Sequence, residues 1–364
     1  MENANKYFEL ADKFQLEGTV ESVAPLGMGH INDSFFVKTK ENDKSDYLLQ
    51  RINHNIFKDV EMLQNNILHV TNHIRKKLKE KGESDIVRKT LTIIPAKDGK
   101  LYYFDGTNYW RVYLFISGGK GYDSITPELA YEAGKAFGEF QNYLSDIPEK
   151  IGETIPNFHN MEFRLKQFQE ALANDAAGRV AANREIIKEI EDRAEDMCKA
   201  ERFGREGKLP KRINHCDTKV NNVLFDDNGR ILCVVDLDTV MPGYVLSDFG
   251  DFIRTGANTG AEDDADLNKI SVNLDIFESY ARGYAKTAKN FLLPIEIENL
   301  PFGAKLLTYM QTVRFFTDYL NGDTYYKIHF PEHNLQRTKA QLKLLKDLEK
   351  NEVKMNEIIK KAFS

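Results

Sequence analysis

Cysteine, tryptophan and long hydrophobic runs are scarce in this sequence, and each scarcity excludes a class of protein. The three cysteines of the 364 residues have no paired spacing, which disfavours both a disulfide framework and a zinc site. No apolar run approaches the roughly 20 residues that a membrane span requires. The first residues also lack the basic and apolar segments of a secretory signal. We therefore expect a cytoplasmic protein with reduced thiols and no membrane partner.

An excess of basic residues is also missing. Lysine and arginine number 50 against 56 acidic residues, which gives a formal net charge of −6. Nucleic-acid binding relies on basic side chains that displace counterions, so we expect no nucleic-acid partner. Hydrophobic residues make up 41% of the chain, enough for a large core. The length suggests two domains or one large two-lobed unit.

The predicted strands and helices divide the chain into two lobes. Before residue 116, strand-like runs surround one long helical pattern at 58–79, whose apolar residues recur every three or four positions. Helical patterns dominate after residue 117, apart from short strands between residues 213 and 238. We predict an α+β, bilobal fold with a small antiparallel-sheet lobe (1–116) and a large, mostly helical lobe (117–364). The strands expected in the first lobe cover residues 34–39, 46–52, 91–95, 101–104 and 109–116.

The strand segment of the second lobe carries a chemical motif. His215, Asp217 and Asn222 fit the pattern H-x-D-x-x-x-x-N, which is the spacing of kinase catalytic loops. A carboxylate in such a loop accepts the proton of the attacking hydroxyl, and the amide oxygen five residues later reaches a magnesium ion. An H-x-D sequence alone is common, and a lone His215 would more often be a packed core residue. The combination with the following segment is what indicates phosphoryl transfer.

That following segment predicts a second metal ligand. Asn222 leads into an apolar run, a turn at Asp227-Asn-Gly229 and a returning apolar run, so Asp236 emerges beside Asn222 at the end of a hairpin. Magnesium prefers oxygen ligands of this kind. Asp238 lies on the same side by strand alternation and is the fallback ligand. Asp248 begins a D-F-G sequence too far downstream for this role, and we expect it to be an N-cap or a buried acceptor that organises the loop and the helix that follows.

Signals for nucleotide binding in the first lobe are weaker. Gly27, Met28 and Gly29 precede a strand, and such glycines let backbone amides approach phosphates, although a plain turn would have the same sequence. A kinase also needs a basic residue on the next strand, paired with an acid on the first long helix. We predict Arg51 and Glu61 for this pair. Gln50 holds the neighbouring strand position, and a shift of one residue points to the opposite face.

These residues resemble the aminoglycoside phosphotransferase and choline kinase group of small-molecule kinases. Within that group, several phrases are similar to the N-acetylhexosamine 1-kinases. The phrases cover most of the chain and are Gly29-His-Ile-Asn-Asp-Ser34, Leu49-Gln-Arg-Ile-Asn53, Phe57-Lys-Asp59, Asp217-Thr-Lys-Val-Asn-Asn-Val-Leu-Phe225, Asp236-Leu-Asp-Thr-Val-Met-Pro-Gly243, Asp248-Phe-Gly-Asp251 and Arg314-Phe-Phe-Thr-Asp-Tyr-Leu-Asn-Gly-Asp323.

The resemblance implies a protein-kinase-like fold and ATP-dependent phosphorylation of the anomeric hydroxyl of N-acetylglucosamine or N-acetylgalactosamine. Asp217 would contact and deprotonate that hydroxyl, and Asn222 and Asp236 would hold Mg²⁺. The segment 27–29 would cover the phosphates of ATP. The remaining implied contacts are Phe115 and Ile116 for adenine, and His30, Arg314, Tyr325 and Tyr326 for the sugar.

Alternatives stay open at the level of the sequence. Arg314 equally fits a structural ion pair, and Tyr325 and Tyr326 fit ordinary surface or core aromatics. A kinase of the same fold could act on choline, ethanolamine, homoserine, methylthioribose or an aminoglycoside, and a non-catalytic nucleotide-binding module is a further alternative. We expect a monomer or a weak homodimer.

Overall fold

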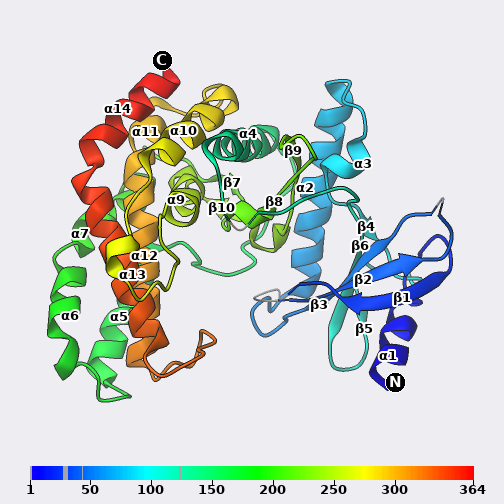
Figure 1. The fold of residues 1–364 in the computed structure, drawn as a ribbon, viewed down its shortest axis with the longest axis horizontal. Helices are drawn as coiled ribbons and strands as arrows, with labels where there is room; N and C mark the ends of the chain where they lie inside the picture. Colours follow the sequence, from blue (N-terminus) through cyan, green and yellow to red (C-terminus); the bar gives the residue numbers. More distant parts are fainter. Residues whose placement is uncertain (1, 28–31, 43, 123) are drawn as a thin grey trace.

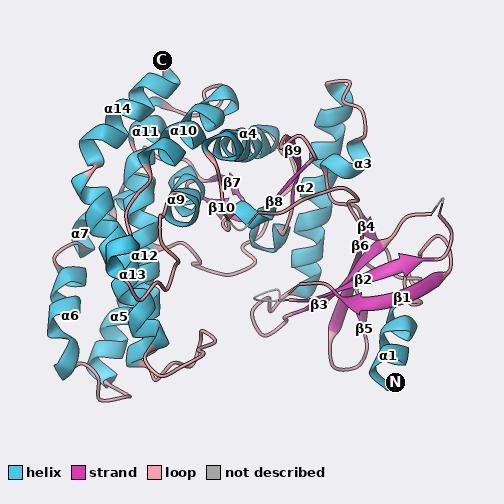
Figure 2. Cartoon of the chain, in the orientation of Figure 1, coloured by secondary structure: helices cyan, strands magenta, loops and turns pink. Residues whose placement is uncertain are grey.

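The first lobe is built on an antiparallel sheet, seen on the right of Figures 1 and 2. The computed structural model describes residues 2–27, 32–42, 44–122 and 124–364. The strand order is β1-β2-β3-β6-β4, with β5 also paired to β6. The predicted hairpin is confirmed, because Val37 of β2 faces Tyr47 of β3. The strands are β1 (Val20–Pro25), β2 (Asp33–Thr39), β3 (Tyr47–Ile52), β4 (Ile93–Ile94), β5 (Tyr103–Phe104) and β6 (Tyr109–Leu114).

The two faces of this sheet are buried against different partners. Leu49 and Val112 face α1 (Glu2–Ala11) and pack in one cluster with Phe14 and Trp110. Side chains alternate along a strand, so Gln50 and Arg111 point to the opposite face, toward the second lobe. The alternation therefore decides which polar groups of the sheet reach the space between the lobes.

One helix joins the cores of the two lobes. Helix α2 (Val60–Glu80) begins at Asp59, whose carboxylate accepts a hydrogen bond from the backbone N–H of Met62 at 2.8 Å. This cap satisfies an amide that the first turn leaves free. The buried face of α2 packs in one hydrophobic cluster with Phe140 and Leu144 of α4 (Pro127–Leu144). The cluster continues to Leu232 in the strand segment of the second lobe.

The second lobe is mostly helical, as predicted, and lies on the left of Figure 1. Two helix pairs cross with their backbones in contact, α4 with α10 at Gly134 and Gly283, and α9 with α12 at Gly250 and Gly303. No described helix is long and apolar enough to cross a membrane. The helices outside those already given are α3 (Ile86–Lys89), α5 (Met161–Asn174), α6 (Arg184–Glu191), α7 (Ala194–Met197), α8 (Lys199–Arg205), α9 (Val245–Gly256), α10 (Leu274–Ala288), α11 (Pro294–Glu298), α12 (Leu300–Leu320), α13 (His333–Lys350) and α14 (Glu352–Phe363).

Short strands lie between the sheet and these helices, where the sequence predicted them. Strand β7 (Arg212–Asn214) pairs with β10 (Met241–Gly243), and β8 (Val223–Phe225) forms a hairpin with β9 (Ile231–Val234). The arrangement is the predicted α+β, bilobal fold. It places the end of the β8–β9 hairpin between the lobes.

Candidate active site

The loop after β7 is held by the buried carboxylate of Asp248. Its two oxygens accept hydrogen bonds from the backbone N–H groups of His215 and Cys216, each at 2.8 Å, and Gln141 Nε2 donates to it at 2.8 Å. Cys216 has φ 62, in the left-handed region that a side chain adopts only when its surroundings hold it there. Asp248 therefore organises the loop as a buried acceptor, one of the two roles predicted, and it is not an N-cap because it lies inside α9, which Tyr244 precedes.

His215 connects the loop to the end of β9. Its Nε2 lies 2.9 Å from the backbone oxygen of Val235, and its Nδ1 faces the N–H of Asp217 at 3.3 Å. Both ring nitrogens are therefore engaged by backbone groups, one after β9 and one in the loop itself. The ring packs edge-on against Phe137 and Phe140, which fixes its orientation. His215 is therefore a buried residue that holds the loop against the segment after β9.

Asp217 carries the charge that the motif predicted. Asn222 Nδ2 donates to its Oδ2 at 3.0 Å, and Lys219 Nζ lies 2.8 Å from its Oδ1. Burial alone would raise the pKa of this carboxyl, but Lys219, His215 and Asn222 together hold the pKa below its usual value. The group is therefore ionised at neutral pH and able to accept a proton.

The hairpin brings Asn222 and Asp236 together. The N–H of Val235 donates to the backbone oxygen of Asn222 at 2.9 Å, and Asp236 follows in a left-handed conformation with φ 58. Desolvation by its surroundings, together with the charges of Asp238 and Asp217, raises the pKa of Asp236 to about 6, although the residue keeps access to solvent. No described side chain donates a hydrogen bond to its carboxylate. An uncompensated carboxylate beside other carboxylates indicates a place for a cation.

The chemistry of this pair fits magnesium. The amide nitrogen of Asn222 is committed to Asp217, which leaves its amide oxygen available. In the described part of the chain, no group of three or more His, Cys, Asp or Glu residues could hold a metal by itself. Magnesium is commonly held by one or two protein oxygens together with water and substrate phosphates. The donor set suits that mode of binding.

Asp238 is not the fallback ligand that strand alternation suggested. Strand β9 ends at Val234, and the left-handed turn at Asp236 leads into a short 3-10 turn, so alternation does not continue. The Asp238 carboxylate is buried and accepts hydrogen bonds from Arg111 Nη1 and Nη2 at 2.5 and 2.9 Å. Its charge is therefore already neutralised by an arginine.

The predicted pair of Arg51 and Glu61 is also wrong. Arg51 points to the face of the sheet away from the second lobe, where its Nε contacts Asp33 at 2.6 Å. Glu61 is exposed in the first turn of α2. The opposite face carries Gln50, whose cross-strand partner is Arg111. The basic residue that faces the other lobe therefore comes from β6 and not from β3.

The expected adenine segment lies at the junction of the lobes. Phe115 and Ile116 follow β6 directly, in the connection to the second lobe, and Phe115 N donates to Asp46 O at 2.9 Å. Gly27 has φ 67, which an L side chain adopts rarely. Met28, Gly29 and His30 lie outside the described residues.

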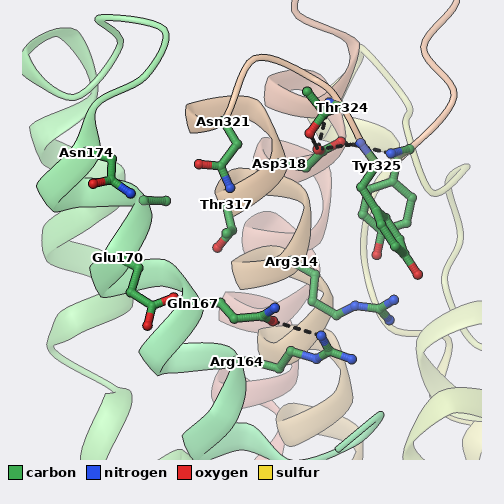
Figure 3. Close-up of a pocket in the computed structure, with 12 residues that line it drawn as sticks. Arg164, Gln167, Glu170, Asn174, Arg314, Thr317, Asp318, Asn321, Thr324 and Tyr325 are labelled. Carbon is green, nitrogen blue, oxygen red and sulfur yellow. Dashed lines mark hydrogen bonds between the residues drawn. The ribbon is translucent and has the colours of Figure 1, made fainter. Parts of the chain in front are cut away.

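A polar pocket brings together three of the predicted sugar-contacting residues. Arg314, Tyr325 and Tyr326 line a cavity of about 310 Å³ between α5 and α12 (Figure 3). Asp318 holds the two tyrosines, since its carboxylate accepts hydrogen bonds from their backbone N–H groups at 2.8 and 2.9 Å. The Arg314 guanidinium lies 5.2 Å from the centre of the Phe158 ring and 5.6 Å from that of Tyr326.

Charged residues of the pocket and of the catalytic loop both affect the pKa of one histidine, His159. Burial and the charges of Arg314 and Arg164 lower the pKa of His159 to about 3, while the charge of Asp217 acts in the opposite direction. The imidazole is therefore neutral. His159 also lines a second cavity, to which Cys216 of the loop contributes.

Comparison with known proteins decides the family. The model of the phosphotransferase enzyme family (APH) matches residues 22–287, which is most of the chain. The chain belongs to this family. The matched segment contains the whole catalytic loop and the β8–β9 hairpin. It ends before α12, so the family model does not reach Arg314 or the two tyrosines of the pocket.

Solved structures of similar phosphotransferases share the fold. A microcompartment-associated aminopropanol kinase superposes with a TM-score of 0.61 at 15% identity, covering 97% of this chain and 98% of its own. An amicoumacin kinase has a TM-score of 0.61 at 14% identity and coverages of 95% and 93%. The choline kinase of Streptococcus pneumoniae has a TM-score of 0.51 at 12% identity and coverages of 91% and 94%. Identities this low establish the fold alone.

Four residues of this phosphotransferase site were not predicted from its sequence. Lys219 stands inside the catalytic motif, and its position two residues after Asp217 was a usable signal. Arg111, His159 and Arg164 had no such signal. Each meets the site only because elements distant in the sequence pack together.

Proposed function

We propose that this phosphotransferase transfers the γ-phosphoryl group of ATP to the anomeric C1 hydroxyl of an N-acetylhexosamine, giving the sugar 1-phosphate. The observation that carries the proposal is the constellation of Asp217, Asn222 and Asp236 in a lobe that also holds a polar pocket lined by Arg314, Tyr325 and Tyr326. Membership of the phosphotransferase family supports the reaction class. The amicoumacin kinase was solved with AMP-PNP, an ATP analogue, which supports ATP as the donor.

Asp217 serves as the proton acceptor in this proposal. Its lowered pKa keeps it ionised, and Asn222 and Lys219 hold its two oxygens in place. Phosphoryl transfer depends mainly on positioning and charge neutralisation, so an oriented carboxylate suffices on the acceptor side. Asn222 and Asp236 would hold Mg²⁺, which supplies the charge that neutralises the phosphates. Phe115 and Ile116 would contact the adenine from the connection between the lobes.

The charges of the pocket favour an uncharged acceptor. Arg164 and Arg314 both line it, and burial together with Arg314 lowers the pKa of Arg164 to about 10. Glu170 and Asp318 also line the pocket, and the Asp318 carboxylate already accepts hydrogen bonds from backbone N–H groups. The formal charges of the lining therefore cancel and leave no excess of acid to attract the ammonium groups of choline, ethanolamine and aminoglycosides. The acetamide of an N-acetylhexosamine has no charge. Arginine and the hydroxyls of Tyr325 and Tyr326 provide hydrogen bonds for sugar hydroxyls, and the tyrosine rings provide an apolar surface.

A panel of acceptors tests the proposal. The purified protein is incubated with ATP, Mg²⁺ and, separately, N-acetylglucosamine, N-acetylgalactosamine, choline, ethanolamine, homoserine, methylthioribose and an aminoglycoside. We expect ADP release only with the N-acetylhexosamines and a product whose phosphorus NMR signal couples to the anomeric proton. Turnover of another acceptor without turnover of the hexosamines would reject the substrate but keep the kinase. Absence of acceptor-dependent ADP release throughout would reject catalysis on these acceptors.

A further inference from the structure

Arg111 and Asp238 form a buried ion pair that joins the two lobes. The guanidinium lies on β6 of the sheet lobe, and the carboxylate lies just after the β8–β9 hairpin. Both residues are at most 2% exposed, and the two groups meet in a fork of two parallel hydrogen bonds at 2.5 and 2.9 Å. A bidentate arginine–carboxylate pair fixes direction as well as distance. The position of the loop after β9 is therefore set from the opposite lobe.

The sheet holds Arg111 in the orientation that this contact needs. Its Nε donates to Gln50 Oε1 at 3.0 Å, and Gln50 Nε2 in turn donates to Ser34 Oγ at 2.8 Å. These groups span three neighbouring strands, β2, β3 and β6. Because the chain of hydrogen bonds lies across the sheet, the guanidinium has little freedom to leave Asp238.

Asp238 is fixed by further contacts from other elements. Asn32 Nδ2 donates to its Oδ2 at 2.6 Å, and Thr154 Oγ1 donates to its backbone oxygen at 2.9 Å. The next residue, Thr239, donates through Oγ1 to the backbone oxygen of His215 at 2.8 Å. The segment is thus bound to both lobes and to the catalytic loop.

Asp236 lies two residues before Asp238. Its left-handed backbone conformation, with φ 58, is unfavourable for a residue with a side chain and persists only where the surroundings impose it. On the other side of Asp236, Val235 is hydrogen-bonded to Asn222. The conformation of Asp236 is therefore determined by Asn222 before it and by Asp238 after it.

We propose that Arg111 is a positioning residue, which acts through Asp238 to hold Asp236 beside Asn222 in the geometry that binds the metal–nucleotide complex. The inference rests on the proposed function for the identity of the metal ligands. The sequence predicted that the important basic residue would be Arg51 on β3; in this proposal it is Arg111 on β6. The cation's partner is a carboxylate of the metal loop and not an acid of α2.

The test measures metal binding directly. Mn²⁺ replaces Mg²⁺ as the probe, and its free concentration is followed by electron paramagnetic resonance in the presence of ADP. Removing one member of a buried pair risks misfolding, so the main variants are Arg111→Lys and the double variant Arg111→Met/Asp238→Leu, which leaves no unpaired charge. The matched control is Arg193→Met, which breaks a bidentate pair with Glu349 away from the cleft.

We expect Mn²⁺ affinity in the presence of ADP to fall about tenfold or more in both main variants, as for other residues that orient metal ligands. Binding of ADP without metal, followed by calorimetry, should change less than threefold, roughly within the scatter of such comparisons. The kcat should fall while the KM for the acceptor stays constant. The control should match the wild type in all three measurements.

Two results would overturn the proposal. One is wild-type Mn²⁺ affinity in a folded double variant, and the other is an equal loss in Arg193→Met. The outcomes also separate this proposal from the proposed function. If the wild type phosphorylates no acceptor of the panel while the Arg111 variants still lose Mn²⁺, the function fails and the positioning role stands. If the wild type phosphorylates the hexosamines and the Arg111 variants bind Mn²⁺ as the wild type does, the proposed function stands and the positioning role fails.

Discussion

Asp217 combines a low pKa with fixed orientation, and these properties make its removal informative. Replacing it by Asn keeps the shape and one acceptor oxygen but removes the negative charge. We expect Asp217→Asn to lower kcat by at least about a hundredfold, because general-base assistance contributes that much. Binding of Mg·ATP should be largely kept. Near-normal turnover in a steady-state assay would show that another group accepts the proton.

Glu201 is another buried acid, and it lies outside the proposed chemistry. Its Oε1 accepts a hydrogen bond from Met161 N at 2.7 Å, while its Oε2 is buried and has no partner among the described residues. Burial raises the pKa of Glu201 from 4.5 to about 7. The folded state therefore holds this proton more tightly than the unfolded chain, and stability falls as pH rises from about 4.5 to 7.

This shift predicts the effect of Glu201→Gln. At pH 8 the variant should be more stable than the wild type by up to about 3 kcal/mol, because the amide carries no charge to bury. Near pH 4.5 the advantage should vanish, since the wild-type acid is then protonated in the folded state. Urea unfolding at the two pH values measures the difference. A pH-independent difference, or the same behaviour in the exposed control Glu357→Gln, would contradict the assignment.

The individual site residues differ in how far the sequence could reveal them. Asp217, Asn222 and Asp236 were predicted to lie together, because a catalytic loop and one hairpin are local in sequence. Asp238 was misassigned because one left-handed residue ends the strand alternation on which the prediction relied. Arg111 is 127 residues from Asp238. Their contact depends on sheet register and lobe packing, which no local pattern encodes.

Among the elements, the crossing of α4 and α10 tolerates no side chain at its centre. A Cβ on Gly283 would lie 1.9 Å from Tyr131 O, and a Cβ on Gly134 would lie 2.2 Å from Tyr280 O. The obstacle in each case is backbone, which cannot rotate away. The glycines thus permit close contact of two helices, one of which, α4, also carries Gln141 to Asp248.

We expect Gly283→Ala to destabilise the protein by about 2 kcal/mol or more. Alanine improves helix propensity by about 1 kcal/mol, but a Cβ this close to backbone should cost about 3 kcal/mol or more, at or above the upper end of the usual overpacking cost. Denaturant unfolding provides the measurement. The control is Gly121→Ala, where a Cβ meets nothing within 4 Å and stability should change by less than about 0.5 kcal/mol. Equal stability of the two variants would contradict the packing argument.

Elements with strong local signals matched the sequence most closely. The 58–79 pattern became α2, which runs from Val60 to Glu80. The strand predicted at 91–95 shortened to Ile93–Ile94. It lies at the edge of the sheet, where pairing on one side alone and the following proline limit its extent.

At the scale of the molecule, the two lobes share one hydrophobic cluster through α2. Leu63 and Ile67 of this helix pack in the same cluster as Phe140 of α4 and Leu237 after β9. The division at residues 116 and 117 therefore cuts through a core. Separation of the lobes would expose apolar surface on both sides.

This shared core predicts that the lobes unfold together. We expect one calorimetric transition whose van't Hoff and calorimetric enthalpies agree, as for a single cooperative unit. Phe140→Ala should lower the midpoint of that one transition without splitting it. Two resolved transitions, or a stable isolated fragment 1–116, would show that each lobe folds independently.

The single tryptophan gives this architecture an optical consequence. Trp110 is buried in the sheet lobe, where its indole N–H donates to Asp105 at 2.8 Å, and it immediately precedes Arg111. Its fluorescence therefore reports on the sheet lobe alone, while far-ultraviolet circular dichroism is dominated by the helices of the other lobe. The protein thus carries its own pair of spectroscopic reporters, one for each lobe, without any introduced label.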